Sequence, residues 1–123
     1  GVCIHTNQAN YDGNFDYNIC GANTGVAHKQ AFPVRNFAAN PFGLYDTIGN
    51  VLEWVQDCVH GDYTGAPTDG SAWENANGGD CGQRVLRGGS WFVQPSRVRS
   101  GNRDWIFFDS FLNYAGFRLA QDL

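Results

Sequence analysis

The sequence predicts an α+β domain with little regular secondary structure. Its 123 residues suffice for a single core and no more. Apolar residues make up 42% of the chain, and nine Phe, five Tyr and four Trp supply large side chains for that core. The 16 glycines favour turns and loops over long helices. We therefore expect one domain over residues 1–123, with short strands and little helix.

The first two thirds of the chain predict loops around one strand. Residues 1–32 are polar and turn-prone, with a tight turn expected at 11–14. Residues 37–55 are the first strongly apolar block, and the pattern at 50–57 fits a buried strand better than a long helix. Residues 60–80 are rich in glycine and predict a long surface loop.

The last third predicts three short core strands, at Val85–Arg87, Val98–Ser100 and residues 117–120. Trp91 and Trp105 are large enough to fill the space between strands, and we expect both in the core. No stretch reaches the length of about 18 apolar residues that a membrane helix needs, so no membrane span is predicted.

The charge distribution is uneven. The net charge of −4 argues against nonspecific nucleic-acid binding, which needs cations to neutralise phosphates. Residues 84–123 nevertheless hold six arginines against three acids. A basic binding face would explain this, but we favour mostly buried structural arginines that tie strands and loops to carboxylates and carbonyls. These are Arg87, Arg99, Arg103 and Arg118.

Four cysteines, Cys3, Cys20, Cys58 and Cys81, allow three disulfide pairings. Pairing neighbours would close two short loops, and each bridge would stabilise the fold by roughly 3 kcal/mol. Disulfides indicate an extracytoplasmic setting, either periplasmic, secreted or at the cell surface. Zinc is the competing use, but the cysteines lack the close pairs of a zinc site and the histidines are scattered.

Four motifs occur in order: Asn-Pro-Phe-Gly-Leu-Tyr-Asp at 40–46, Gly-Asn-Val-Leu-Glu-Trp at 49–54, Arg-Val-Leu-Arg-Gly-Gly-Ser-Trp at 84–91 and Gly-Phe-Arg-Leu-Ala at 116–120. Together they resemble the formylglycine-generating enzyme, or sulfatase-modifying factor, domain family, which has a variant of the C-type lectin fold. The resemblance implies that fold for residues from about Asn10 onward. It also implies that this chain is a C-terminal portion, because family domains have about as much chain again upstream.

The resemblance implies a structural calcium site at Asp46, Gly49, Val51 and Glu53. In catalytic relatives the matching positions supply two side-chain oxygens and two backbone carbonyls, which are the hard ligands calcium prefers. The alternative is that Glu53 is a buried carboxylate paired with one of the arginines.

Catalysis of the family's type is not expected. Formylglycine-generating enzymes hold copper between two thiolates that follow the Gly-Gly-Ser motif, and the matching positions here are Val93 and about Val98. No cysteine follows Cys81, so we expect no copper and no copper-dependent activity. Related sulfoxide synthases bind iron through a separate helical domain, which this sequence lacks. Ser90 has no histidine near it in sequence to act as a base.

Residues 91–115 are the candidate ligand-binding segment. Aromatic and polar residues alternate there with neither a strand nor a helix period. Large flat side chains on a rigid frame supply contact area at low entropic cost, as recognition surfaces need. The alternative is that they fill the core. The candidate ligand-binding residues are Phe92, Val93, Gln94, Ser96, Asp104, Ile106, Phe107, Phe108, Ser110, Phe111, Leu112, Asn113 and Tyr114.

One branch of the family is similar in this segment. The variable proteins of diversity-generating retroelements end in the same frame of motifs, and the residues between are rewritten at the adenines of asparagine-rich template codons. Such changes yield Phe, Val, Ile, Leu, Ser, Asp and Tyr, which account for most of residues 104–114, Trp105 being the exception. Two variable patches, at 92–96 and 104–114, would then flank an invariant stretch at 98–103.

The sequence therefore predicts a noncatalytic domain that binds a protein or another surface ligand. One rival is an oxygen- or sulfur-chemistry enzyme of the same superfamily whose metal site lies in a missing part. Another is a structural or assembly subunit whose apolar surface packs against its own N-terminal portion or against further copies.

Overall fold

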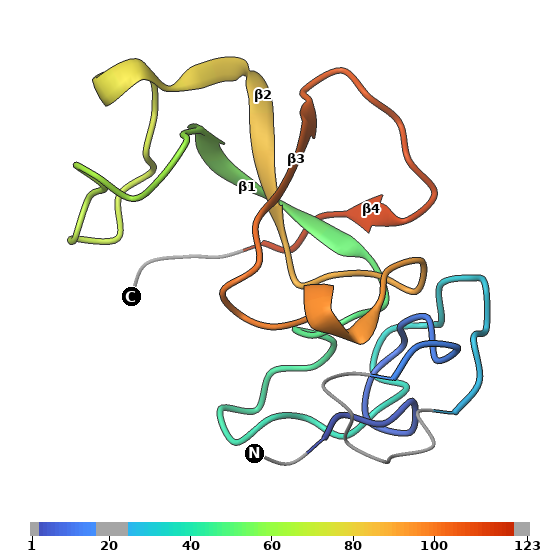
Figure 1. Cartoon of the computed structure of the whole chain (residues 1–123). Helices are drawn as coiled ribbons and strands as arrows, with labels where there is room; N and C mark the ends of the chain where they lie inside the picture. Colours follow the sequence, from blue (N-terminus) through green and yellow to red (C-terminus); the bar gives the residue numbers. More distant parts are fainter. Residues whose placement is uncertain (1–2, 17–24, 120–123) are drawn as a thin grey trace.

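A computed structural model describes residues 3–16 and 25–119 (Figure 1). Their regular structure is one four-stranded sheet and two short 3-10 helices, η1 (Ala76–Gly78) and η2 (Pro95–Arg97). The strands are β1 (Leu52–Val59), β2 (Asp80–Arg87), β3 (Asp104–Phe107) and β4 (Ala115–Gly116), in the order β3-β2-β1-β4. The expected scarcity of regular structure is confirmed. In this part of the chain, no helix has the length and apolar character needed to cross a membrane.

The centre of the sheet is the antiparallel pair β1 and β2. Leu86 lies opposite Trp54, and Leu52 and Leu86 are buried. The strand expected at 50–57 is confirmed, two residues further along. A disulfide between Cys58 and Cys81 joins the two strands and closes the expected loop between them. Cys3 is also disulfide-bonded, whereas Cys20 lies outside the described residues.

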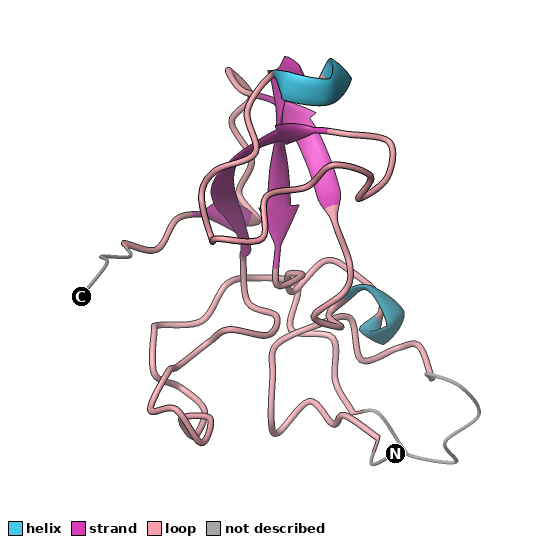
Figure 2. Ribbon diagram, turned by 90° about the vertical axis from the view of Figure 1, so that its left-hand side faces the viewer, coloured by secondary structure: helices cyan, strands magenta, loops and turns pink. Residues whose placement is uncertain are grey.

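The long loops of the N-terminal half gather at one end of the sheet (Figure 2). A buried amide pair holds them there. The Asn50 side chain accepts hydrogen bonds from the Phe32 backbone N–H (2.8 Å) and from Asn10 Nδ2 (3.2 Å), and its Nδ2 donates to the Phe32 carbonyl (3.2 Å). The Asn50 carbonyl accepts the Trp91 N–H (2.9 Å), so these loops also fix the start of the 91–115 segment.

An apolar cluster lies between the loops and the C-terminal third. It contains Ala9, Tyr11 and Val98, with Ile4 and Val93 packed against it. Gly89 makes the close approach possible, because a Cβ there would lie 2.6 Å from Val98 Cγ1. Its φ of 74° is also a conformation that favours glycine.

The strand expected at Val98–Ser100 is wrong. The N–H groups of Arg97 and Val98 donate to the carbonyls of Gln94 (2.9 Å) and Pro95 (3.3 Å), which coils the chain into η2 and a bend. Val98 is buried as expected, at 3% exposure, but it packs from a turn.

The strand expected at residues 117–120 is also wrong. The pairing with β1 covers only Ala115 and Gly116, and Ala120 lies outside the described residues. Phe117 and Leu119 are exposed rather than in the core, because the chain leaves the sheet after Gly116.

Trp105 was expected in the core but is 59% exposed, because it lies on β3 at the edge of the sheet. The four structural arginines bond partly as expected. Arg87 donates to the Asn102 carbonyl (2.9 Å), Arg103 donates to the His60 carbonyl (3.3 Å), and Arg118 pairs with Glu53. Their predicted burial is wrong, since each of the four keeps contact with solvent and Arg99 is exposed.

Candidate ligand-binding site

A cavity of about 200 Å³ lies where β3 meets the loops on either side of it. Leu52 of β1 and Leu86 of β2, both buried, form its sheet side. The remaining walls come from three stretches of the last third of the chain. They are Phe92, Val93 and Arg97, then Asp104, Trp105 and Ile106, then Leu112 and Tyr114.

The cavity brings together six of the thirteen predicted ligand-binding residues, from segments that are separated in sequence. They are Phe92, Val93, Asp104, Ile106, Leu112 and Tyr114. The fold therefore joins the two predicted patches, 92–96 and 104–114, into one surface.

Aromatic side chains form one wall of this cavity. The rings of Phe92 and Tyr114 stack with centroids 5.3 Å apart, and Trp91 meets both rings edge-on. Trp91 Nε1 lies 3.5 Å from the Asn113 carbonyl oxygen, which links the two loops. Each aromatic pair of this kind contributes about 0.5–1.5 kcal/mol beyond the hydrophobic energy of the area it buries. The contacts among these rings therefore stabilise the wall without a ligand.

Polar contacts hold the opposite wall. Arg97 Nη1 lies 2.7 Å from Asp104 Oδ1, and Asn102 Nδ2 donates to Asp104 Oδ2 (2.9 Å). The Arg97 side chain is largely exposed, so water screens the ion pair and its contribution is small. Its effect is geometric, because it ties η2 to the start of β3.

The other predicted ligand-binding residues lie outside the cavity lining. Phe107, Phe108 and Phe111 are exposed, Phe111 almost completely at 99%. Gln94 and Asn113 are exposed, whereas Ser96 and Ser110 are half-buried. We call the cavity together with the exposed aromatic residues Phe92, Trp105, Phe107, Phe108 and Phe111 the 92–114 surface.

Sequence reasoning missed Trp105 and Arg97 as lining residues. The sequence assigned Trp105 to the core, and its access to the cavity follows from its place on the edge strand β3. Arg97 carried no signal, because its pairing with Asp104 depends on the turn at η2 that was predicted as part of a loop.

The two positions that match the copper thiolates of the family lie together in the structure. Val98 is buried in the apolar cluster with Ala9 and Tyr11, and Val93 packs against the same cluster. Two aliphatic side chains thus occupy the place that the resemblance assigns to metal ligands.

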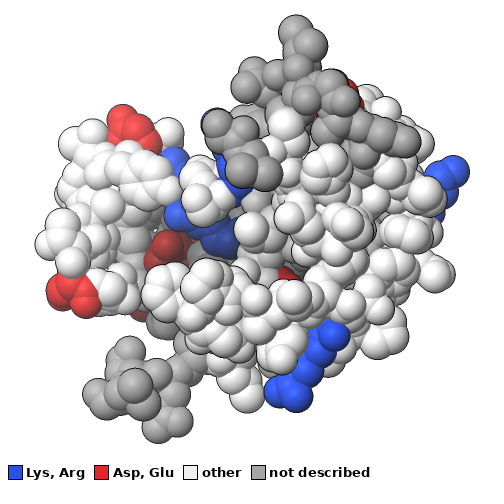
Figure 3. Space-filling model, turned by 90° about the horizontal axis from the view of Figure 1, so that it is seen from below, with Lys and Arg blue, Asp and Glu red and all other residues white. Residues whose placement is uncertain are grey.

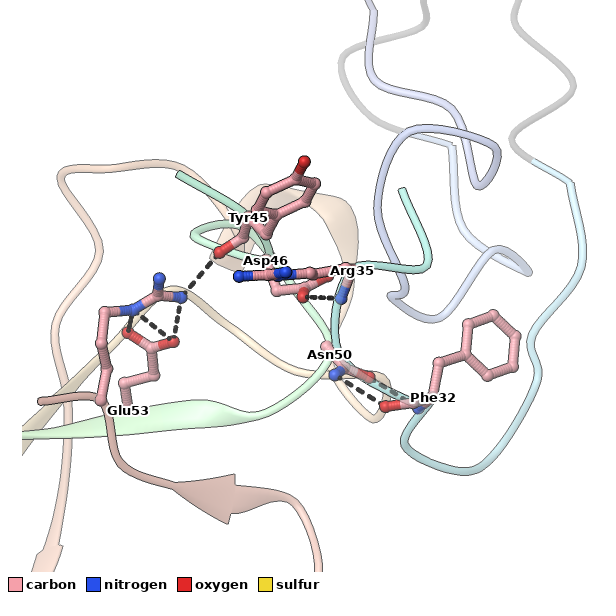
Figure 4. Close-up of polar contacts among 7 residues, drawn as sticks. Phe32, Arg35, Tyr45, Asp46, Asn50 and Glu53 are labelled. Carbon is pink, nitrogen blue, oxygen red and sulfur yellow. Dashed lines mark hydrogen bonds and ion pairs between the residues drawn. The ribbon is translucent and has the colours of Figure 1, made fainter. Parts of the chain in front are cut away.

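A second cleft of about 370 Å³ holds the predicted calcium residues. Asp46, Val51 and Glu53 line it, and Gly49 lies between them in sequence with a φ of 75°. Figure 4 shows Arg35, Tyr45 and Asp46 close together, with Glu53 on one side and Asn50 on the other. Asp46 Oδ2 accepts the Arg35 N–H at 2.7 Å.

Glu53 has an arginine partner, as the alternative to calcium anticipated. Arg118 Nη2 lies 2.6 Å from Glu53 Oε1, and Arg118 Nε donates to both carboxylate oxygens. The hydrogen bonds to Glu53 raise the pKa of the Arg118 guanidinium. The oxygen donors suit a hard cation, but a calcium ion would have to share Glu53 with this guanidinium.

One face of the molecule carries few charged side chains. In the view from below, most of the surface is uncharged, and basic and acidic side chains meet in a recess (Figure 3).

Comparison with known proteins identifies the family. The sequence pattern of the sulfatase-modifying factor enzyme 1-like domain matches residues 5–123. The chain belongs to this family. It is 34% identical over 98 residues to the formylglycine-generating enzyme of Streptomyces coelicolor, covering 77% of this chain and 30% of the enzyme.

Two solved structures are similar to the chain as well. PvdO from Pseudomonas aeruginosa has a TM-score of 0.70 and 38% identity, over 90% of this chain and 38% of PvdO. Treponema denticola variable protein 1 has a TM-score of 0.68 and 31% identity, over 91% of this chain and 35% of that protein. The predicted C-type lectin-like fold of the formylglycine-generating-enzyme type is confirmed, as is the resemblance to a variable protein.

The chain spans 14% and 30% of the first two curated relatives that it matches. The family contains enzymes as well as a variable protein. Membership therefore establishes the scaffold, and activity has to be argued from the site.

Proposed function

We propose that this protein is a noncatalytic ligand-binding domain that presents the 92–114 surface to a protein ligand. The observation that carries the proposal is the cavity, which gathers six predicted ligand-binding residues and is lined in part by the exposed rings of Phe92 and Trp105. Contiguous exposed apolar surface with a polar rim is typical of interaction sites. Buried aromatic anchors commonly dominate the energy of protein interfaces.

The rigidity of the frame supports the same function. β3 is hydrogen-bonded to β2, the Arg97–Asp104 pair ties down its start, and the Trp91, Phe92 and Tyr114 rings pack against one another. A preorganised surface loses little side-chain entropy when a ligand binds, which favours affinity.

The aliphatic pair at Val93 and Val98 supports the noncatalytic part of the proposal. Copper(I) selects soft thiolate ligands, and two valines packed against Tyr11 offer none. The rival enzymatic function makes a clear prediction. A copper-dependent enzyme would bind Cu(I) tightly and consume oxygen in the presence of a thiol substrate, whereas we expect neither from this protein.

Diversification by a retroelement is the finer form of the proposal. Treponema denticola variable protein 1, a structural neighbour, is named for variability. The segments that would vary meet at one surface, while the Gly-Gly-Ser-Trp and Gly-Phe-Arg motifs flank them. A near-repeat of the codons for residues 91–116 beside the gene, differing at adenines, together with a reverse transcriptase gene, would support it. Absence of both from the gene's neighbourhood would contradict it.

Two further properties belong to the proposal. The Cys58–Cys81 disulfide is consistent with an extracytoplasmic protein, and we propose display at the cell surface. Calcium bound at Asp46, Gly49, Val51 and Glu53 would brace the turn before β1, away from the ligand. It is proposed as a structural ion only.

The test of the function is a selection for binding partners from a phage-displayed library of protein fragments. Selected ligands should lose at least about tenfold in affinity when Phe108 or Phe111 is changed to serine, since each change removes an apolar contact worth about 1.4 kcal/mol or more. Phe42→Ser is the matched control, because Phe42 is a phenylalanine outside the 92–114 surface whose exposure, 87%, lies between those of Phe108 (67%) and Phe111 (99%). Ligands that respond to Phe42→Ser and ignore the two surface variants would overturn the proposal.

The assembly-subunit alternative has its own readout. Sedimentation equilibrium on the full chain separates a stable oligomer, which that alternative requires, from a protein whose apolar surface is free for another ligand.

A further inference from the structure

The edge of the sheet at β3 carries hydrogen-bonding groups that the described part of the chain leaves unpaired. β3 is the outer strand, and its partner β2 lies on one side only. The Phe108 N–H donates to the Gly82 carbonyl (3.2 Å), and bonded pairs alternate along an antiparallel ladder. Asp104 and Ile106 therefore direct their backbone groups to β2, while Trp105 and Phe107 direct theirs outward.

Three outward groups are available. The Phe107 carbonyl accepts the Ser110 N–H (3.0 Å), which leaves the Trp105 N–H, the Trp105 carbonyl and the Phe107 N–H. No hydrogen bond within the described residues uses these three groups. They are spaced as a fifth strand of the sheet, added beside β3, would need, on alternate residues of one edge.

Apart from its short length of four residues, this edge lacks the usual protection against pairing with another chain. Natural edge strands carry lysine, proline or a bulge that prevents an added strand. β3 reads Asp-Trp-Ile-Phe, with a regular register against β2 and exposed aromatic side chains at Trp105 and Phe107. Its one charge, on Asp104, is already paired with Arg97.

A hollow lies on each face of the sheet beside this edge. On the face of Ile106 is the apolar cavity of about 200 Å³ already described. On the face of Trp105 is a groove of about 370 Å³, whose lining includes Asp80, Gln83, Arg103 and Trp105. Trp105 borders both hollows.

The two hollows differ in character. Apart from the Arg97–Asp104 pair, the first one is lined by apolar side chains such as Ile106, Leu112 and Phe92, whereas Asp80, Gln83 and Arg103 give the second hydrogen-bonding groups beside the Trp105 ring. Successive side chains of a strand point to opposite faces. A strand added along β3 would thus place every second side chain in an apolar site and the others beside polar groups.

We propose that β3 binds an extended segment of the protein ligand as an additional strand of the sheet, with alternating apolar and polar side chains. This inference rests on the proposed function and specifies how the ligand is recognised. Backbone hydrogen bonds to Trp105 and Phe107 supply affinity without regard to sequence, and the two hollows supply selectivity. The pairing leaves the variable side chains free to change while the mode of binding persists.

The test uses a random heptapeptide phage library against the full chain, followed by synthesis of the enriched peptide. We expect enriched sequences to alternate apolar and polar residues. N-methylation removes a backbone donor while keeping each side chain. Two versions of the peptide are made, one methylated at the odd-numbered residues and one at the even-numbered residues, because only alternate N–H groups of an added strand face β3. The version that loses the N–H facing β3 should lose at least about tenfold in affinity, corresponding to one lost hydrogen bond of about 1.5 kcal/mol. The other version should bind as the unmodified peptide does.

Amide hydrogen exchange supplies an independent readout. In the free protein, Trp105 and Phe107 amides should exchange rapidly and Ile106 slowly. The peptide should slow both rapid amides at least about tenfold, as expected for newly formed hydrogen bonds. The Phe42→Ser variant should bind the peptide unchanged, because Phe42 is an exposed phenylalanine outside both β3 and the 92–114 surface.

Three results would overturn the inference. They are enrichment without alternation or no enrichment, equal binding of the two methylated peptides, and slow exchange of Trp105 and Phe107 in the free protein. In the last case another part of the polypeptide or a second copy already pairs with β3, and sedimentation distinguishes the two. If peptide binding fails while selected protein ligands still respond to Phe111→Ser, the proposed function stands and only the strand addition is wrong.

Discussion

The Asn50 side chain holds the N-terminal loops against the start of the 91–115 segment, and its truncation should unfold that junction. Asn50→Ala removes three hydrogen bonds, with the Phe32 N–H, the Phe32 carbonyl and the Asn10 amide. Asn10 Nδ2 retains a bond to the Gln30 carbonyl (2.9 Å), so the Phe32 backbone bears most of the loss.

The magnitude follows from these contacts. Each buried group left without a partner costs about 1–3 kcal/mol, and here one N–H and one carbonyl are affected. Asn50 also has a φ of 69°, a left-handed conformation that costs alanine about 1–2 kcal/mol and that asparagine tolerates better. Partial access of water to the Phe32 carbonyl reduces the total, so we expect a loss of about 3–5 kcal/mol in the free energy of unfolding.

The assay is equilibrium unfolding in urea with the disulfides intact, analysed by linear extrapolation. Asn50→Asp keeps the acceptor oxygen and the tolerance of left-handed φ but loses the donor, so it should cost about 1–3 kcal/mol. Asn36→Ala, at an exposed asparagine, should change stability by less than about 0.5 kcal/mol. Asn50→Ala within about 1 kcal/mol of the natural protein would refute the reasoning, since it would mean that these amides are not a structural junction.

Three further predictions concern the scaffold. Gly89→Ala should lower the free energy of unfolding in urea by about 2–4 kcal/mol, because its Cβ would meet Val98. Gly43→Ala, at a φ of 77° but in open space, should lower it by only about 1 kcal/mol through backbone strain. Equal losses for the two variants would contradict this reasoning. Replacing both cysteines of the β1–β2 disulfide, 23 residues apart, by serine should cost about 3 kcal/mol, and an unchanged urea midpoint would show that the bridge is dispensable. If calcium binds as proposed, millimolar calcium should raise the Tm of the natural protein, and Asp46→Asn or Glu53→Gln should abolish that rise. If calcium does not change the Tm of the natural protein, the calcium site is wrong and Glu53 only pairs with Arg118.

The sequence predicted the scaffold well where local patterns and family motifs coincide. β1 and β2 carry the apolar pairs Trp54-Val55 and Val85-Leu86, and the cysteines near their ends closed the glycine-rich loop as expected. The motifs identified the fold because glycines such as Gly49 and Gly89 are needed at close contacts: a Cβ on Gly49 would meet the Asn10 carbonyl. The need for glycine at such positions is visible in the short motifs themselves, so the motifs can be recognised without knowing how the rest of the chain folds.

The misjudged elements depended on long-range geometry. Val98 is as apolar as a strand residue, but Pro95 begins a 3-10 turn that buries it from a different direction. Phe117 looks like a core residue, yet the parallel pairing with β1 ends one residue before it. β3 lay unrecognised inside the segment assigned to irregular binding loops, because an edge strand with both faces accessible shows no period of two.

The sequence predicted the candidate site as one continuous segment, residues 91–115, whereas in the structure the site is a surface that also includes residues of β1 and β2. Six of its residues meet at one cavity, but no pattern in the sequence shows that Leu52 and Leu86 from the sheet would form its base. The pairing of Glu53 with Arg118 joins residues far apart in sequence, so the choice between arginine and calcium could not be made from the spacing of the motif.

The most direct test of the account is the amide hydrogen exchange footprint of a selected protein ligand on the intact chain. The account predicts that exchange slows within residues 91–115, including β3, and stays unchanged around the cleft formed by residues 34–53 and 117–118. Slowed exchange confined to that cleft, with residues 91–115 unaffected, would contradict it, because the ligand would then bind the face that we assign to the scaffold.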